Sequence, residues 1–389
     1  MEVRQLVRLD DEELKPLLVL DRETKISLYM PVQQEPDKRD ENRIRLKNLI
    51  QAAEENLDLM NFRRPDSMRL LSPARELVKG GRFLDNSHPG MAIFLADGFS
   101  QAYKIPYEPP QIFCVCAHYQ IKPIMPLKLI EPFYILVLSQ QSVRLLQATE
   151  FSVERLNLGD AVPDSLDEAL HWDDPEKQLQ WHTGTGSENG GRSAIFHGHG
   201  VATKESQKTN LYRYFQLLDQ GISRLLTRNR APILLAGVDY LLPIYREASS
   251  NENLFDREII GSQEHLTDMA IQKQAWPLVR NHFRADEEAA RSSYHEMAAK
   301  DLASDDLISV VKATYQGRVE TLFVDVIAQE WGEFNPDTGQ VAKKPQRQPG
   351  ATELTNLATI YTVLHDGDVY AGQREAMPTT EAAAAIYRF

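Results

Sequence analysis

One feature limits the possible folds of this chain more than any other: it has two short apolar runs, residues 133–138 (FYILVL) and 233–238 (ILLAGV). Continuous apolar runs of this length are typical of strands that a sheet buries on both faces. Between them, residues 143–148 and 150–156 predict two more strands, and apolar residues three and four positions apart from 211 onward predict an amphipathic helix. Strands followed by a helix and a further strand predict an α/β fold.

The chain of 389 residues is too long for one ordinary domain. The sequence predicts a mixed α/β (α+β) protein of three domains. Residues 1–130 form an N-terminal α/β domain, and residues 131–262 form the middle domain with a long Gly-rich loop. Residues 263–303 read as almost wholly helical and predict a connector. Residues 304–389 predict a C-terminal domain of helices and strands.

The formal net charge of the chain is −13. A protein of this charge lacks the global positive field with which proteins coat nucleic acid, so a DNA partner is not expected. The N-terminus has no apolar segment of the secretory type, and no apolar run approaches the roughly 20 residues of a membrane span. We therefore expect a cytoplasmic protein without a membrane partner.

Cys114 and Cys116, the only two cysteines, alternate with His118 along one predicted strand and so share a face. These three side chains could form half of a zinc site, but the sequence offers no second half. A disulfide between residues two apart in a strand would be badly strained. We therefore expect buried thiols in a reducing compartment, and no metal or other cofactor.

Positive charge gathers in the second half of the middle domain. From residue 188 to residue 230, seven Lys and Arg stand against three acids, a local excess of four positive charges. Such a stretch suits contact with RNA phosphates, and a solvated helix face is the common alternative. The candidate RNA-binding residues are Lys204, Lys208, Arg213, Arg224, Arg228 and Arg230.

The segment from about residue 160 to residue 203 is rich in Asp, Gly, His and Ser and has no usable periodicity. Loops this long in a compact domain are usually functional or disordered. His197 and His199 could bind a metal or act as a general base, but no carboxylate or thiol is placed convincingly beside them. We expect loop histidines that are solvated or contact RNA, and no metal.

These segments, in their order, resemble the archaeo-eukaryotic class 1 peptide-release factors and their relative Pelota. The nearest match is the bacterial branch, family 3-like. The hairpin FYILVLSQQSVRLLQATEFSVERL, the helix over residues 204–227 and the strand ILLAGVDY look like the middle domain of that superfamily. The resemblance implies an RNase-H-like middle domain and a C-terminal domain like ribosomal protein L7Ae. It also implies the ribosome and peptidyl-tRNA as partners, and it leaves open whether a GTPase partner exists.

The long loop carries the sequence NGGRSA at residues 189–194, where release factors place a Gly-Gly-Gln motif. In that family the glycines let the backbone enter the peptidyl-transferase centre, and the glutamine helps to arrange a water against the peptidyl-tRNA ester. Arg192 stands where that glutamine would be and can reach as far, but its side chain is charged and offers no hydrogen-bond acceptor. By this resemblance Gly190, Gly191 and Arg192 are the candidate catalytic residues, at most for a peptidyl-tRNA hydrolase-like activity. Residues 42–45 (NRIR) are the nearest counterpart of the Asn-Ile-Lys-Ser loop that reads stop codons, so stop-codon reading is not expected.

The first hypothesis is a ribosome-associated factor of the termination or rescue type that acts near peptidyl-tRNA. It would either hydrolyse the ester or only displace a stalled complex, as Pelota does without the Gly-Gly-Gln motif. The second is a non-catalytic adaptor or structural protein that keeps the fold without binding the ribosome. A hydrolase that uses His197 or His199 is a third, and a nuclease is disfavoured because the strand over residues 133–138 carries no carboxylate.

Overall fold

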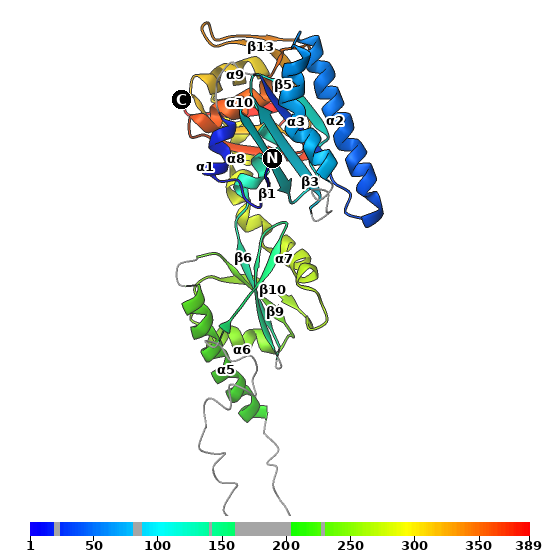
Figure 1. Ribbon diagram of the computed structural model, residues 1–389. Coiled ribbons are helices and arrows are strands. Elements are labelled where there is room, and N and C mark those ends of the chain that lie inside the picture. The colour runs from blue at the N-terminus through cyan, green and yellow to red at the C-terminus, as the bar shows by residue number, and fades with distance from the viewer. Residues whose placement is uncertain (19–23, 81–87, 140–141, 160–203, 227–229) are drawn as a thin grey trace, which may run out of the picture. The chain divides into compact units, whose positions relative to one another are not determined.

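The structure is a computed structural model that describes the chain except residues 19–23, 81–87, 140–141, 160–203 and 227–229 (Figure 1). The chain divides into two compact units. The composite unit combines Met1–Ile130 with Arg284–Phe389, and the middle unit is Glu131–Phe283. None of the helices among the described residues has both the length and the apolar character of a membrane span.

The middle unit is built on a five-stranded mixed sheet with the strand order β10-β9-β6-β7-β8. Strand β6 pairs antiparallel with β7 and parallel with β9, and β9 pairs parallel with β10. This is the RNase-H-like strand order that the family resemblance implies. The strands are β6 Phe133–Leu138, β7 Val143–Ala148, β8 Val153–Leu156, β9 Ile233–Gly237 and β10 Leu254–Ile260.

Both faces of this sheet are covered by helices, which explains the continuous apolar run of its central strand. Successive residues of a strand point to opposite faces. Tyr134 and Leu136 lie in the core with α5 and α6, whereas Ile135 and Val137 lie in the core with α7. The helices are α5 Lys204–Leu225, α6 Leu241–Ala248 and α7 Asp268–Phe283.

The N-terminal segment of the composite unit is a five-stranded sheet of order β1-β4-β3-β2-β5 that packs against two long helices, α2 and α3. Leu28 and Ile93 of the sheet share one core with Leu46 of α2 and Leu71 of α3. The elements are β1 Val3–Gln5, α1 Asp11–Leu14, β2 Lys25–Pro31, α2 Arg39–Leu59, α3 Arg64–Gly80, β3 Gly90–Ala96, β4 Phe99–Ile105 and β5 Ile112–Cys116.

The C-terminal segment of the composite unit has a four-stranded sheet, β11-β17-β12-β16, and a small three-stranded sheet, β14-β13-β15. Strand β12 pairs antiparallel with β17 and parallel with β16. This mixed architecture is consistent with the L7Ae-like domain that the resemblance implies. The elements are α8 Ala285–Ala298, β11 Ala303–Ser304, α9 Leu307–Tyr315, β12 Val319–Asp325, β13 Trp331–Asn335, β14 Gln340–Lys343, β15 Thr352–Glu353, α10 Leu354–Leu364, β16 Asp368–Gly372 and β17 Ala383–Tyr387.

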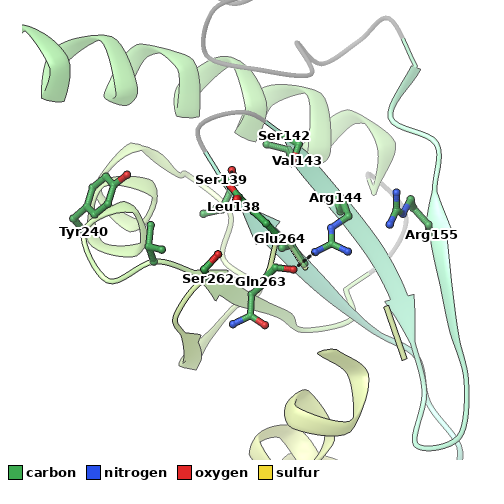
Figure 2. A pocket seen from close by; sticks show the side chains of 12 residues that line it. Leu138, Ser139, Ser142, Val143, Arg144, Arg155, Tyr240, Ser262, Gln263 and Glu264 are labelled. Carbon is green, nitrogen blue, oxygen red and sulfur yellow. Dashed lines mark hydrogen bonds between the residues drawn. The ribbon is translucent and has the colours of Figure 1, made fainter. Parts of the chain in front are cut away.

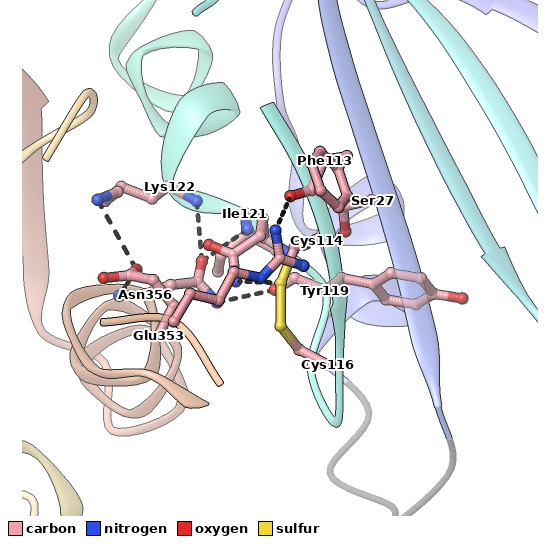
Figure 3. Close-up of a disulfide and its surroundings, with 11 residues drawn as sticks. Ser27, Phe113, Cys114, Cys116, Tyr119, Ile121, Lys122, Glu353 and Asn356 are labelled. Carbon is pink, nitrogen blue, oxygen red and sulfur yellow. Dashed lines mark hydrogen bonds and ion pairs between the residues drawn. A yellow bond between two sulfur atoms is a disulfide. The ribbon is translucent and has the colours of Figure 1, made fainter. Parts of the chain in front are cut away.

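A buried ion pair joins the two segments of the composite unit (Figure 3). The side chain of Lys122 is 1% exposed and that of Glu353 is 0% exposed, and Nζ of the lysine lies 3.7 Å from Oε2 of the glutamate. The ammonium also donates to Oγ1 of Thr355 at 2.8 Å and to the backbone oxygen of Ala328. These partners replace the water that Lys122 loses on burial.

Asn356 adds a second set of hydrogen bonds across the same junction (Figure 3). Its Oδ1 accepts from the backbone N–H of Ile121 at 2.8 Å and of Lys122 at 3.2 Å. Its Nδ2 donates to the backbone oxygen of Tyr119 at 2.9 Å. One buried amide thereby satisfies three backbone groups of the other segment, which fixes how the two segments pack.

The cysteines beside this junction form a disulfide, so the expectation of two free thiols is wrong (Figure 3). Cys114 and Cys116 point to the same face of β5, and their Cα atoms lie 5.9 Å apart, within the range that a disulfide spans. Both pack in one apolar cluster with Trp331 and Ala351. Paired in this way, the two sulfurs are not available as thiolate ligands for a zinc ion.

The structure also differs from the expected domain organisation. Residues 1–130 and the C-terminal segment share one compact unit, because the Lys122–Glu353 pair and its neighbours are buried between them. The expected connector, residues 263–303, is divided between the units. Its first helix, α7, buries Ile271 and Val279 against the middle sheet, and its second helix, α8, belongs to the composite unit.

Candidate nucleic-acid interface of the middle unit

Helix α5 presents one apolar face to the middle sheet and one polar face outward. Leu211, Phe215, Leu218 and Ile222 recur every three or four residues and are all buried. The amphipathic helix that the sequence predicts is therefore confirmed. The side chains of Arg213 and Arg224 are exposed on the opposite side of the helix.

The one carboxylate in the described part of α5, Asp219, is turned into the protein. It is 2% exposed and accepts hydrogen bonds from the Tyr245 hydroxyl at 3.2 Å and from Oγ of Ser249 at 2.5 Å. It also accepts from the backbone N–H and the hydroxyl of Ser250, at 2.9 and 3.1 Å. Burial, and then the charge of Asp219, raise the pKa of Tyr245, so its hydroxyl stays a donor.

Among the described residues of α5, the exposed charged side chains are therefore all positive. Between residues 208 and 226, the exposed charged side chains of α5 are Lys208, Arg213 and Arg224. Lys208 lies toward α6, where its Nζ is 3.6 Å from Oε2 of Glu247. Both of these side chains are 62% exposed, so their attraction is weak and leaves the lysine accessible to other anions.

The predicted RNA-binding residues are only partly brought together. Arg213 and Arg224 share the outer face of α5, and Arg230 is exposed just before β9. Lys204 is the first residue of α5, and its side chain lies outside the described part of the structure. The remaining candidates, Gly190, Gly191, Arg192, His197, His199 and Arg228, also lie outside the described residues.

The nearest counterpart of a stop-codon loop, residues 42–45, lies inside helix α2. Asn42 is fully buried and exchanges two hydrogen bonds with the backbone of Gln33, accepting from its N–H at 2.9 Å and donating to its oxygen at 2.8 Å. Asn42 therefore anchors the first turn of α2 to the preceding chain, and it does not belong to a reading loop.

Sequence reasoning missed a cleft at the carboxyl ends of the middle strands (Figure 2). Arg144 on β7 and Arg155 on β8 both bind the carboxylate of Asp268, the first residue of α7. No motif marks these residues, and the carboxylate lies 113 or more positions from either arginine along the chain. Only the strand order places them together. Among the described residues, no group of three or more His, Cys, Asp or Glu is placed to hold a metal ion.

Comparison with known proteins gives a match on the middle unit. Residues 133–281 match the family model of bacterial archaeo-eukaryotic release factor family 7. The matching family is therefore family 7, where the sequence had suggested family 3. A search of curated proteins finds no match.

Several solved structures are similar to the chain at low identity. The archaeal translation termination factor aRF1 is 14% identical over 98% of this chain and 99% of its own, with a TM-score of 0.25. Archaeal Pelota in a ribosome-bound model with ABCE1 is 13% identical over 73% and 70%, with a TM-score of 0.36. Pelota from Archaeoglobus fulgidus is 12% identical over 77% and 79%, with a TM-score of 0.29. At these scores the likenesses carry no weight of their own.

The family match covers almost the whole middle unit, including the sheet, α5, α6 and most of α7. It falls on the same segments, in the same order, that carry the resemblance in the sequence. Residues 133–281, which make up most of the middle unit, therefore match a family of bacterial archaeo-eukaryotic release factors.

Proposed function

We propose that this protein is a cytoplasmic, ribosome-directed factor of the translation termination or rescue type. The observation that carries the proposal is the match of residues 133–281 to a release factor family. The partners would be the ribosome and peptidyl-tRNA, met by the middle unit. A GTPase partner is not part of the proposal.

The charge distribution of α5 supports contact with RNA. Arg213 and Arg224 stand on a helix face whose only acid, among the described residues of α5, is buried. In a chain of net charge −13, such a surface concentrates positive charge where phosphates could approach. Binding through phosphates weakens as salt rises, because each contact releases counterions from the RNA.

The first test is sedimentation of the full chain with vacant and with stalled ribosomes at two salt concentrations. We expect salt-sensitive co-sedimentation of the wild type. The double variant Arg213→Glu and Arg224→Glu should bind at least about tenfold more weakly and should show a shallower salt dependence. The matched control is Arg280→Glu, which reverses an exposed charge on α7 of the same unit and should bind like the wild type.

Equal ribosome binding by the wild type and the α5 double variant would contradict an interface at this helix. No binding to either ribosome state would favour the alternative function, an adaptor that keeps the release factor fold without the ribosome.

Hydrolysis is a separate step of the proposal and rests on Gly190, Gly191 and Arg192. If Arg192 cannot arrange a water as glutamine does, the wild type should release little peptide from peptidyl-tRNA on the ribosome, and Arg192→Gln should release more. Release by the wild type that Arg192→Ala abolishes would instead assign the catalytic role to the arginine.

A further inference from the structure

Residues on or shortly after all five strands of the middle sheet line a cleft of about 710 Å³, which lies at the carboxyl ends of β6, β9 and β10 (Figure 2). Ser139 follows β6, Tyr240 follows β9 and Gln263 follows β10, while Arg144 and Arg155 come from β7 and β8. The volume lies in the range of about 300–1,000 Å³ that is usual for small-molecule sites. The carboxyl ends of parallel strands are also where α/β sheets commonly bind ligands.

One end of the cleft is built to receive an anion. Arg144 is 13% exposed and is fixed by three acceptors, the backbone oxygens of Gln263 (2.7 Å) and Leu266 (3.2 Å) and Oδ1 of Asp268 (2.8 Å). Arg155 is 54% exposed and donates from Nε and Nη2 to the same carboxylate, at 3.1 and 3.0 Å. Two guanidinium groups thus share one carboxylate at this end of the cleft, and Glu264 is the one acidic residue among the described residues that line the cleft itself.

The exposed arginine is the group that can reach a ligand. Nη1 of Arg155 makes no hydrogen bond to any residue in the described part of the chain. Asp268 holds the rest of its guanidinium in place, so a bound anion would meet an already oriented donor. Guanidinium groups bind phosphate oxygens with short, charge-assisted hydrogen bonds.

The other parts of the cleft suit the sugar and base of a nucleotide. Figure 2 shows Tyr240 and Arg155 at opposite ends of the labelled side chains, with Glu264 between them. Tyr240 is 51% exposed, and such aromatic rings stack on nucleic-acid bases. The Glu264 carboxylate accepts from Ser139 at 2.5 Å and keeps further acceptor positions.

Gln263 supplies a buried acceptor that lacks a donor. It lines the cleft and is only 5% exposed, and its Oε1 has no hydrogen-bond partner among the described residues. Buried polar atoms without a partner are rare, because the lost hydrogen bond to water is not replaced. A ligand with hydroxyl groups, such as ribose, would supply the missing donors.

We propose that this cleft binds a ribonucleotide, with the phosphate at Arg155, the ribose hydroxyls at Glu264 and Gln263, and the base against Tyr240. A carboxylate that accepts from ribose hydroxyls is a common device for recognising nucleotides. The same chemistry is offered by a free ribonucleotide and by one unit of a single-stranded RNA, and binding measurements distinguish the two.

The experiment is calorimetric titration of the full chain with AMP, with dAMP, with inorganic phosphate and with a short single-stranded oligoadenylate. AMP should bind more tightly than phosphate, and more tightly than dAMP because the deoxynucleotide lacks one donor. Oligoadenylate that binds more tightly than AMP identifies RNA as the ligand, whereas the reverse order identifies a free nucleotide. Both orders support a ribonucleotide site.

Four variants locate the binding. Arg155→Ala and Tyr240→Ala should each weaken AMP binding by about tenfold or more. Glu264→Gln should reduce the preference for AMP over dAMP. Asp268→Asn removes a negative charge beside the phosphate position but keeps an amide oxygen that can still accept from Arg155, so it should tighten AMP binding, a gain that loss of folding cannot produce. The control Arg280→Ala removes an exposed charge elsewhere in the unit and should leave AMP binding unchanged.

The proposal is overturned if AMP and oligoadenylate both fail to bind the wild type. It is equally overturned if Arg155→Ala and Tyr240→Ala bind AMP as the wild type does. These titrations contain no ribosome, and the cleft residues are not those of the α5 face. Absence of nucleotide binding therefore does not contradict the proposed ribosome contact. Absence of ribosome binding likewise does not contradict the nucleotide site.

Discussion

At the level of single residues, Asp268 makes contacts in the middle unit that the sequence does not predict. Burial opposes its ionisation, but the hydrogen bonds and charges of Arg155 and Arg144 outweigh it and hold the pKa of Asp268 below the ordinary 3.8. The three residues lie on β7, β8 and α7, and nothing in their local sequence marks them as partners. A single sequence predicts strands well from residue types, but it does not reveal which side chains meet across a sheet.

The Asp268 carboxylate should make the stability of the wild type depend on pH, and replacing it should remove this contribution. A pKa that is lower in the folded chain adds stability above about pH 3.8, and that stability is lost as the pH falls through the folded-state pKa. Asp268→Asn should lower the free energy of unfolding by about 1–2 kcal/mol at neutral pH. Urea unfolding should show a smaller difference at pH 3. Asp256→Asn, an exposed carboxylate on β10, is the control and should have little effect at either pH.

At the level of elements, the sequence predicts both the length and the buried face of helix α5. For α7 it predicts only that the segment is helical. The apolar spacing of α5 defines both its length and its buried face, because one face of the helix is strongly apolar. The spacing of Ile271, Ala275 and Val279 also predicts a helix in α7, but not the surface that it covers. A helix with this spacing could link two domains or pack against a sheet, and the spacing alone does not distinguish the two.

The element-scale prediction concerns the attachment of α5 to α6. Asp219→Ala should destabilise the protein by about 2–4 kcal/mol, because Tyr245, Ser249 and Ser250 lose a buried acceptor that they share. Thermal unfolding followed by calorimetry measures the loss. Gln220→Ala changes the next residue, which is exposed, and should cost less than about 0.5 kcal/mol. Equal effects of the two changes would show that the Asp219 network is not what holds the helix.

At the level of the whole molecule, the composite unit could not be predicted, although most of its elements could. Helical and strand patterns in residues 1–130 and 304–389 are local properties of the chain. Their association depends on contacts such as Asn356 to Ile121, between residues 235 positions apart. The disulfide was missed for a related reason, since the expectation judged the strand alone and could not include the backbone that sets the Cα separation of Cys114 and Cys116.

A double-mutant cycle tests the junction. Lys122→Met or Glu353→Gln alone should cost about 3–5 kcal/mol, because each change leaves a buried group without its partner. The double variant should cost clearly less than the sum of the two. The exposed pair Lys79–Glu76 is the matched control, with Nζ 2.8 Å from Oε1 and side chains 72% and 66% exposed. Lys79→Met should cost less than about 1 kcal/mol. Additive effects at the junction would rule out coupling between Lys122 and Glu353.

The composite unit also sets the order in which the chain can mature during its synthesis. The middle unit is one continuous segment, so all of its strands have been made before the C-terminal segment of the composite unit exists. Lys122 meets its carboxylate only after a further 231 residues (353 − 122) have been added. At about 5–20 residues per second, that interval lasts on the order of 10–50 s. The middle unit is itself synthesised during this interval, and from residue 283 onward the nascent chain holds a complete middle unit and an N-terminal sheet whose junction with the C-terminal segment is still open.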